Sequence, residues 1–247
     1  MQQVNSLQQI REALMTEGLM ETIAPSNPMD LFDSWIADAE ELKFHNANAM
    51  TVATVNSDIA PSVRNVLLRG RLGEGLVFYT NYESDKAVDL EQNNKAAVLM
   101  GWLEIERQIR FTGEVEKIDA RSSDQYFSSR ARGSQISAVV SKQSRPVASR
   151  SELEAAWVAL DSELADLSPS RPSHWGGYVF TPNSIEFWQG RPTGYTTDFG
   201  IGEKTEGGRW AGSRPEVWPT RFVLTSRALR SLNHLSKPHD VEPSQAP

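Results

Sequence analysis

The segment Met50-Thr51-Val52-Ala53-Thr54-Val55 is the first of three short stretches rich in β-branched residues. Ser62 to Arg69 and Leu76 to Thr80 follow it, after Asn-Ser-Asp and Gly-Glu-Gly turns. β-Branched residues bounded by turn residues are typical of strands. The middle of the chain is therefore predicted to contain closely spaced strands.

Further strands and several helices are predicted on both sides of this region. Two helices separated at Ala24-Pro25-Ser26-Asn27-Pro28 fill the first ~45 residues, and the second directs Leu31, Phe32, Trp35, Ile36 and Ala39 toward a core. Other helices are expected at Ser84 to Gln92, Asp119 to Arg130 and Ser151 to Leu167, the last with a capping box of Ser151 and Glu154. Other strands are expected at Ala96 to Trp102, Arg107 to Glu116, Trp175 to Phe180 and Ser184 to Trp188. The pattern predicts a mainly β chain with added helices, of the α+β class, built as a β-barrel.

Composition excludes several classes of function. The 247 residues, with 39% hydrophobic and 23% charged, are typical of a globular protein with one large or two small domains. There is no apolar run of the ~18 residues that a membrane span needs, and the N-terminus lacks the charged-then-apolar layout expected of a signal peptide. A net charge of -7 argues against general nucleic-acid binding, and the absence of cysteine is compatible with the cytoplasm. The four histidines have no ligand spacing, so no metal site is expected.

Arg64-Asn65-Val66-Leu67-Leu68-Arg69 places two guanidinium groups on one strand. Strict alternation would direct them to opposite faces, so both reach one ligand only near a bulge or a cleft rim. Solvent-exposed strand arginines are the alternative interpretation.

The next segment indicates an anion site more strongly. Tyr79 and Thr80 end a strand, and Ser84-Asp85-Lys86 opens a helix. A helix N-terminus offers free N–H groups and a positive dipole, and Lys86 adds a full charge. Together with the arginines, these groups could hold a phosphate. A capped surface helix with an unrelated lysine remains the alternative.

A second basic cluster comprises Tyr126, Arg130, Arg132 and Ser134, followed by Ser141-Lys142-Gln143-Ser144-Arg145. Helical spacing places Tyr126 and Arg130 on one face, where a ring and a guanidinium suit a planar, phosphorylated ligand. Two basic clusters in an acidic chain predict two phosphates, or one phosphate and another anion.

In this order, the motifs resemble the pyridoxine/pyridoxamine 5′-phosphate oxidases, which are FMN-dependent split-barrel homodimers. The resemblance runs from about Pro28 to Gly190. It is carried by Arg64 to Arg69, Val77 to Asn81, Glu106-Arg107-Gln108, Ser134-Gln135-Ile136, Val140 to Ser144, Trp175-Gly176-Gly177 and Glu186-Phe187-Trp188-Gln189-Gly190.

This resemblance implies the site residues. FMN contacts fall on Arg64, Asn65, Val66, Leu67, Leu68, Arg69, Tyr79, Thr80, Lys86, Gln108, Gln143, Ser144 and Trp188. Substrate contacts fall on Arg11, Arg69, Tyr126, Arg130 and Ser134. The site of the family lies between two subunits, and a core position is the alternative for Trp188. No catalytic nucleophile or base is expected, because the flavin carries the chemistry.

Several positions depart from the family pattern. Arg69 stands where the family has lysine, Asp85 stands where an arginine helps to bind the FMN phosphate, and the N-terminal Arg-Arg-x-Tyr motif is reduced to Arg11. After Gly190 the family continues through Arg-Leu-His-Asp-Arg, whereas Gly194 to Asp198 read Gly-Tyr-Thr-Thr-Asp.

A change of reading frame explains the last departure. One permitted codon set for residues 191–204, read two nucleotides later, gives Thr-Asp-Arg-Leu-His-Asp-Arg-Phe-Arg-Tyr-Arg-Arg-Lys. We therefore expect three parts: a helical arm (1–28), an FMN-binding split barrel (29–190) without its last strand, and a disordered, out-of-frame tail (191–247).

The predicted function is oxidation of pyridoxamine or pyridoxine 5′-phosphate to pyridoxal 5′-phosphate, with O2 reduced to H2O2. The altered tail is expected to weaken FMN binding and turnover. The alternatives are another split-barrel flavin reductase, or a non-catalytic protein that binds FMN or pyridoxal phosphate.

Overall fold

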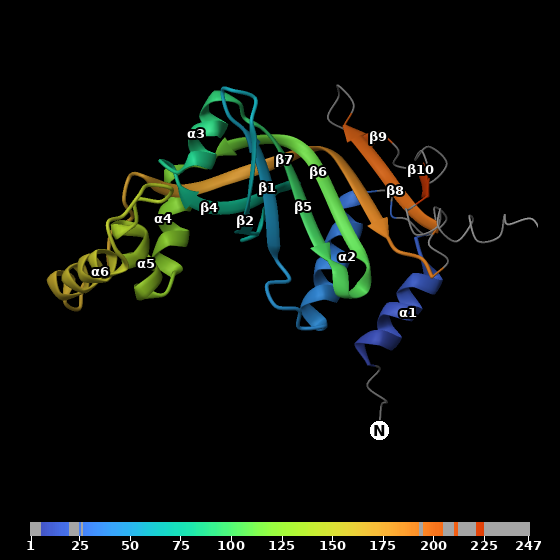
Figure 1. Cartoon of the computed structure of the whole chain (residues 1–247), viewed down its shortest axis with the longest axis horizontal. Helices are drawn as coiled ribbons and strands as arrows, with labels where there is room; N and C mark the ends of the chain where they lie inside the picture. The colour runs from blue at the N-terminus through green and yellow to red at the C-terminus, as the bar shows by residue number, and fades with distance from the viewer. Residues whose placement is uncertain are drawn as a thin grey trace, which may run out of the picture.

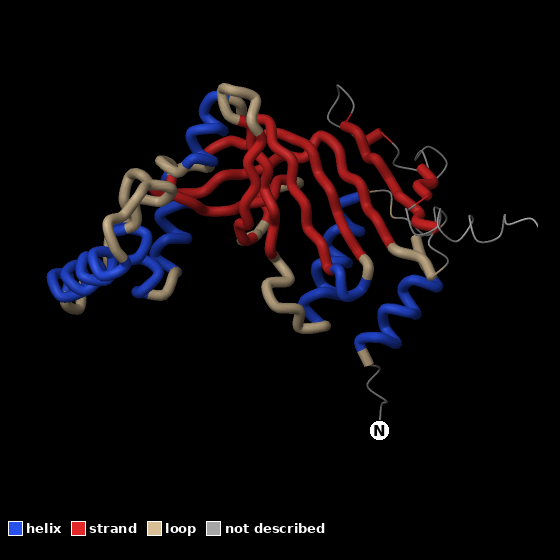
Figure 2. The backbone as a smooth tube through the Cα atoms, viewed as in Figure 1, coloured by secondary structure: helices blue, strands red, loops and turns tan. Residues whose placement is uncertain are grey.

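A computed structural model describes residues 6–19, 25 and 27–192, together with the backbone of strands at 195–204, 210–211 and 221–224. One curved antiparallel sheet occupies the centre of the molecule, with helices at both ends (Figures 1 and 2). Among the described residues, no helix has the length and apolar character needed to cross a membrane.

The sheet is built from neighbours that run antiparallel. β1 (Ala49–Val55) pairs with β2 (Pro61–Leu67) and with β5 (Lys95–Trp102). β5 pairs with β6 (Arg107–Lys117), which in turn pairs with β7 (Trp175–Gln189). Inward-facing residues of β1 and β6 alternate with more exposed ones, as expected for strands with one face on a core. These strands confirm the predicted mainly β architecture.

Backbone hydrogen bonds close this sheet into a barrel. β4 (Gly75–Asn81) pairs with the first half of β7 and with the two-residue β3 (Arg71–Leu72). Arg69 N donates to Val77 O at 2.8 Å, and Val77 N donates to Gly70 O at 2.9 Å, so the chain leaving β2 joins β4. The barrel therefore runs in the order β1, β5, β6, β7 and β4, and it closes where β4 meets the chain leaving β2, which pairs with β1.

The barrel is split at β7. The first half of β7, Trp175 to Phe180, pairs with β4, whereas the second half, Ser184 to Gln189, pairs with β8 (Tyr195–Lys204). β6 pairs along the opposite edge of β7 and shifts register between Thr112 and Gly113. The two segments predicted as separate strands here are thus one long strand.

The expectation that the barrel lacks its last strand was wrong. β8 adds to β7, and β10 (Arg221–Leu224) and the two-residue β9 (Trp210–Ala211) add to β8. Residues 195–201 contain β-branched and aromatic residues, and the free edge of β7 offers N–H and C=O groups that need partners. The predicted disorder of the remaining tail lies outside the described residues.

The helices lie in two groups (Figure 1). α4 (Ala120–Ser129), α5 (Arg132–Val140) and α6 (Arg150–Leu164) gather at one end of the sheet, and α1 (Leu7–Glu17) lies at the other end. α2 (Pro28–Glu41) packs against the barrel core, where the Trp35 ring meets Phe187 edge to face at 5.3 Å. α3 (Asp85–Gln92) follows β4 directly.

Two details of the helices differ from the sequence-based expectation. Ser149, not Ser151, caps α6, because its side chain accepts a hydrogen bond from Glu152 N. The helix α5 was not predicted, since its sequence Arg-Gly-Ser-Gln-Ile-Ser begins with residues that favour turns.

Candidate functional site

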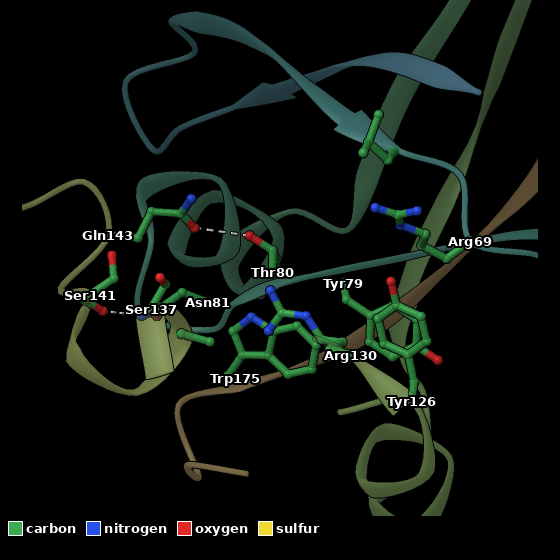
Figure 3. A pocket seen from close by; sticks show the side chains of 12 residues that line it. Arg69, Tyr79, Thr80, Asn81, Tyr126, Arg130, Ser137, Ser141, Gln143 and Trp175 are labelled. Atoms are coloured by element: carbon green, nitrogen blue, oxygen red, sulfur yellow. Dashed lines mark hydrogen bonds between the residues drawn. The ribbon is translucent and has the colours of Figure 1, made fainter. Parts of the chain in front are cut away.

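Two neighbouring cavities open where β2, β4 and the segment after α5 meet. The first, of about 310 Å³, is here called the ring cavity because aromatic side chains form its floor. Its lining residues are Leu67, Arg69, Tyr79, Thr80, Asn81, Tyr126, Arg130, Ser137, Ala138, Ser141, Gln143 and Trp175 (Figure 3).

Three rings in the ring cavity lie nearly parallel. The Tyr79 and Tyr126 centroids are 3.8 Å apart with planes inclined by 14°, and those of Tyr79 and Trp175 are 5.5 Å apart at 13°. Tyr79 comes from β4, Tyr126 from α4 and Trp175 from the start of β7, so the barrel and the helices build this stack jointly. Stacked rings offer an apolar, planar surface to a flat ligand.

Arg130 lies over this stack with an unused hydrogen-bond donor. The Arg130 side chain lies over the Trp175 ring (Figure 3), with its guanidinium carbon 4.6 Å from the ring centroid. Its Nη1 atom is buried and has no hydrogen-bond partner among the described residues. Burial lowers the pKa of Arg130, Tyr126 opposes this shift and Arg69 adds to it. A buried, unpartnered guanidinium nitrogen next to a second arginine is an arrangement that an anion would stabilise.

The second cavity, of about 400 Å³, is here called the lysine cavity. It is lined by Ser62, Val63, Arg64, Asn65, Val66, Tyr79, Thr80, Asp85, Lys86, Gln143 and Ser144. Lys86 is 6% exposed, and its Nζ donates to Thr80 Oγ1 at 2.9 Å, Ser84 Oγ at 3.0 Å and Gln143 Oε1 at 3.1 Å. Burial lowers the pKa of Lys86 to about 8, with a further contribution from Arg64.

Arg64 is held rigidly at the edge of the lysine cavity. Its Nη1 donates to Thr54 Oγ1 at 2.7 Å, and its Nη2 donates to Ser62 Oγ at 2.8 Å. Asp89 Oδ2 lies 3.8 Å from Nη2 and accepts a 2.6 Å hydrogen bond from Thr54. Burial lowers the pKa of Arg64, and Asp89 and Asp85 oppose this effect. A fixed guanidinium presents its charge to a ligand with little loss of side-chain entropy.

The two cavities share a wall formed by Tyr79, Thr80 and Gln143. Gln143 Oε1 accepts a hydrogen bond from Thr80 Oγ1 at 3.0 Å (Figure 3). It also accepts one from Lys86 Nζ. Asn81 Nδ2 donates to Ser141 O at 3.2 Å and ties the segment after α5 to β4. Two anions bound in these cavities would therefore be neighbours separated by one layer of side chains.

Most of the predicted site residues line these cavities. They are Arg64, Asn65, Val66, Leu67, Arg69, Tyr79, Thr80, Lys86, Tyr126, Arg130, Gln143 and Ser144. Arg64 lies on β2 and lines the lysine cavity, whereas Arg69 follows the end of β2 and lines the neighbouring ring cavity.

Five predicted residues do not line either cavity. Leu68 packs against the barrel core, and Ser134 is exposed on α5. Gln108 and Trp188 face each other across the β6–β7 ladder. Arg11 forms an ion pair with Glu106.

Sequence reasoning missed several lining residues. Ser137 and Ala138 were missed because α5 was not predicted, and Asn81 and Ser141 were quoted in motifs without a role. Trp175 also belonged to a quoted motif, Trp-Gly-Gly, and its position at the start of a predicted strand was the available signal.

Comparisons with known proteins identify related chains. A family model described as "Pyridoxamine 5'-phosphate oxidase" matches residues 37–161. A pyridoxine/pyridoxamine 5′-phosphate oxidase from Cupriavidus metallidurans is 45% identical over 190 residues, which cover 77% of this chain and 89% of the relative.

Two solved structures share the fold. The crystal structure of PhzG from Burkholderia lata 383, in complex with tetrahydrophenazine-1-carboxylic acid, is 22% identical with a TM-score of 0.72 and covers 85% of this chain and 100% of that chain. A pyridoxamine 5′-phosphate oxidase-related, FMN binding protein from Nostoc punctiforme is 16% identical with a TM-score of 0.59 and covers 78% of this chain and 96% of that chain.

Proposed function

Because this chain belongs to the pyridoxamine 5′-phosphate oxidase family, we propose that it binds FMN and acts on pyridoxamine and pyridoxine 5′-phosphates. The reaction would give pyridoxal 5′-phosphate, with O2 reduced to H2O2. The observation that carries this proposal is the pair of cation-lined cavities sharing one wall, because cofactor and substrate each bear a phosphate.

The lysine cavity fits the phosphate of FMN. Lys86, Arg64 and the Thr80 hydroxyl converge there, and Lys86 is buried with a lowered pKa. A lysine that is costly to charge without a partner would gain stability from an anion. We assign the FMN phosphate to these three residues, with Gln143 and Ser144 as further polar contacts.

The ring cavity fits the phosphate of the substrate. The unpartnered Nη1 of Arg130 and the neighbouring Arg69 supply positive charge, and Tyr126 supplies a hydroxyl. These residues come from α4 and from the segment after β2, so the pocket depends on how the helices pack against the barrel. The buried guanidinium favours a phosphorylated vitamer over an unphosphorylated one.

When bound, FMN would accept two electrons from the substrate and pass them to O2, which gives H2O2. The residues of the chain bind and orient both ligands. Two fixed phosphates restrain the relative positions of the two rings, which lowers the entropic part of the barrier. No side chain is assigned the role of nucleophile or general base.

We propose that two chains together complete the site. Gln108 and Trp188 match the FMN contacts of the family but lie outside both cavities of a single chain. A second copy could bring this pair to the cofactor, consistent with the subunit-interface site that the resemblance implies.

A second candidate function is FMN binding without efficient turnover. The family's Arg-Leu-His-Asp-Arg segment falls on Gly194 to Asp198 of this chain, so its arginines and histidine are absent. Loss of such ligand contacts leaves their partners unpaired and is expected to slow oxidation.

One experiment tests both candidates. The purified chain is mixed with FMN, and cofactor retention is followed by flavin absorbance near about 450 nm. Pyridoxamine 5′-phosphate is then added under air and peroxide is measured, with unphosphorylated pyridoxamine as the matched control. Bound flavin with peroxide supports the oxidase, and bound flavin without peroxide supports the binding protein. Absence of bound flavin contradicts both.

A further inference from the structure

Arg145 contacts the first turn of α3 from another segment of the chain. Its Nη1 donates to Asp85 Oδ1 at 2.8 Å, and its Nη2 donates to Glu83 O at 2.9 Å. Asp85 and Lys86 both line the lysine cavity, whereas Arg145 does not line it and instead lines an adjoining cavity together with Asp85. The ion pair therefore places a third cation at the margin of the proposed phosphate site.

The charges around the lysine cavity balance without this arginine. Arg64 and Lys86 are the two cations that line the cavity. Asp85 also lines the lysine cavity, and Asp89 Oδ2 lies 3.8 Å from Nη2 of Arg64. Asp85 acts on both cations, since its charge raises the pKa of Lys86 and of Arg64 against the effect of burial. Two carboxylates thus oppose two cations, which gives a poor receptor for a phosphate dianion.

We propose that Arg145 is a binding determinant for the FMN phosphate, because its pairing with Asp85 leaves the lysine cavity with net positive charge. This inference rests on the proposed function, since it takes FMN as the ligand. Asp85 then serves to hold the Arg145 guanidinium near the cavity, and its own charge is neutralised there. The family has an arginine at the position of Asp85 on α3. In this chain the positive charge at that corner is instead carried by Arg145, on the segment that also carries Gln143 and Ser144.

A purely structural role for Arg145 is the competing explanation. Ser144 has a positive φ of 65°, and Arg145 N donates to Lys142 O at 3.0 Å to close the turn. A left-handed conformation is unfavourable for a residue with a side chain, so this turn needs external support. If the Arg145–Asp85 ion pair only stabilised the turn, loss of either residue would weaken FMN binding equally.

A double-mutant cycle distinguishes an effect of Arg145 on the net charge of the lysine cavity from an effect on the stability of the turn at Ser144. The dissociation constant of FMN is measured by quenching of flavin fluorescence for the unaltered chain, D85N, R145Q and D85N/R145Q. We expect R145Q to bind FMN about three- to tenfold more weakly at low salt. D85N should bind at least as tightly as the unaltered chain, and the double variant should recover the affinity that R145Q lost.

Matched controls test the specificity of this effect. Arg150→Gln removes the same charge from an exposed pair with Glu154 and should leave FMN binding unchanged. Riboflavin lacks the phosphate, so its affinity should not differ between the variants. High salt should reduce the effect of R145Q, because an exposed pair is screened. Melting temperatures of the variants check that each is folded.

Two results overturn the inference while leaving the proposed function standing. One is FMN affinity unchanged in R145Q. The other is D85N weakening FMN binding as much as R145Q does, without recovery in the double variant. Failure of the unaltered chain to bind FMN is a different result, which overturns the proposed function and this inference together.

Discussion

Lys86 Nζ lies 3.1 Å from Oε1 of Gln143, and this contact joins the floor of the lysine cavity to the wall that it shares with the ring cavity. Lys86 is fixed by the helix that follows β4, whereas Gln143 arrives on the segment after α5. The three hydrogen-bond acceptors of Lys86, on Thr80, Ser84 and Gln143, are neutral, so its charge has no anionic hydrogen-bond partner among the described residues. An incoming phosphate would supply one.

FMN affinity should fall as the pH rises through about 8. Burial lowers the pKa of Lys86 to about 8, so the ammonium that attracts the phosphate is present below this pH and is lost above it. The phosphate itself stays a dianion above about pH 7 and does not add to the trend. Fluorescence titrations of FMN across this range measure the effect. Lys86→Met should bind weakly with no pH step, and Lys95→Met, at an exposed lysine, should behave as the unaltered chain. A pH step that persists in Lys86→Met would contradict the assignment.

Arg130→Leu should weaken binding of pyridoxal 5′-phosphate by about 10- to 100-fold, because it removes a charged hydrogen-bond donor from the ring cavity. Its Nη1 is buried without a partner, so an apolar replacement should cost the apoprotein little stability. Absorbance of the bound aldehyde and thermal melting provide the two measurements. Arg121→Leu on the exposed face of α4 is the control. Equal affinities for Arg130→Leu and Arg121→Leu would show that the ring cavity does not hold this phosphate.

Gly113→Ala should destabilise the barrel by about 2–3 kcal/mol. A Cβ at this position would lie 2.2 Å from Thr181 O and 2.9 Å from Pro182 Cα, at the register shift between β6 and β7. Both of these contacts are backbone atoms, which cannot move aside as a side-chain end can. Urea unfolding measures the change. Gly133→Ala, where a Cβ would meet Trp157 at an ordinary 3.6 Å, should be neutral or stabilising. Equal stabilities for the two variants would mean that β6 and β7 do not approach in this way.

The gene should encode the family motif in a frame shifted by two nucleotides after about Arg191. The same shift allows Ala211-Gly212-Ser213-Arg214-Pro215 to be read as Arg-Leu-Ala-Pro and Pro215-Glu216 to be read as a TGA stop codon. Resequencing the region from the codon of Gly190 measures this directly. A chain with the restored frame should oxidise pyridoxamine 5′-phosphate faster than the present one. Codons that cannot encode Arg-Leu-His-Asp-Arg in the shifted frame would disprove the idea.

The sequence predicted those elements whose local signals agree with their final environment. β1 alternates buried and half-buried residues because one face lies on the core, and its β-branched sequence shows this directly. β7 was divided into two strands because Pro182 interrupts its pattern, but this proline falls beside the bulge opposite Gly113 and the strand continues through it. β8 was missed because Gly200 and Gly202 interrupt its β-branched residues, and pairing with the edge of β7 supplies the missing stability.

The candidate site was predictable where a charged side chain lies at the N-terminus of a predicted helix, as Lys86 does. Lys86, Thr80 and Arg64 were found from residue type and local structure alone, and they do lie together. Trp175 and Arg145 were named in motifs without an assigned contact, because their contacts join segments far apart in the sequence. Gln108 and Trp188 were identified by resemblance, and in the single chain they pair across β6 and β7 and line neither cavity.

We infer that the lysine cavity binds the phosphate of FMN, and titration of the chain with FMN and with riboflavin measures the contribution of that phosphate. The two ligands share the flavin ring and differ in the phosphate. We predict that FMN binds at least about tenfold more tightly than riboflavin, and that Lys86→Met removes most of this difference. Equal affinity of the unaltered chain for the two ligands, or an FMN affinity that is unchanged in Lys86→Met, would contradict the claim.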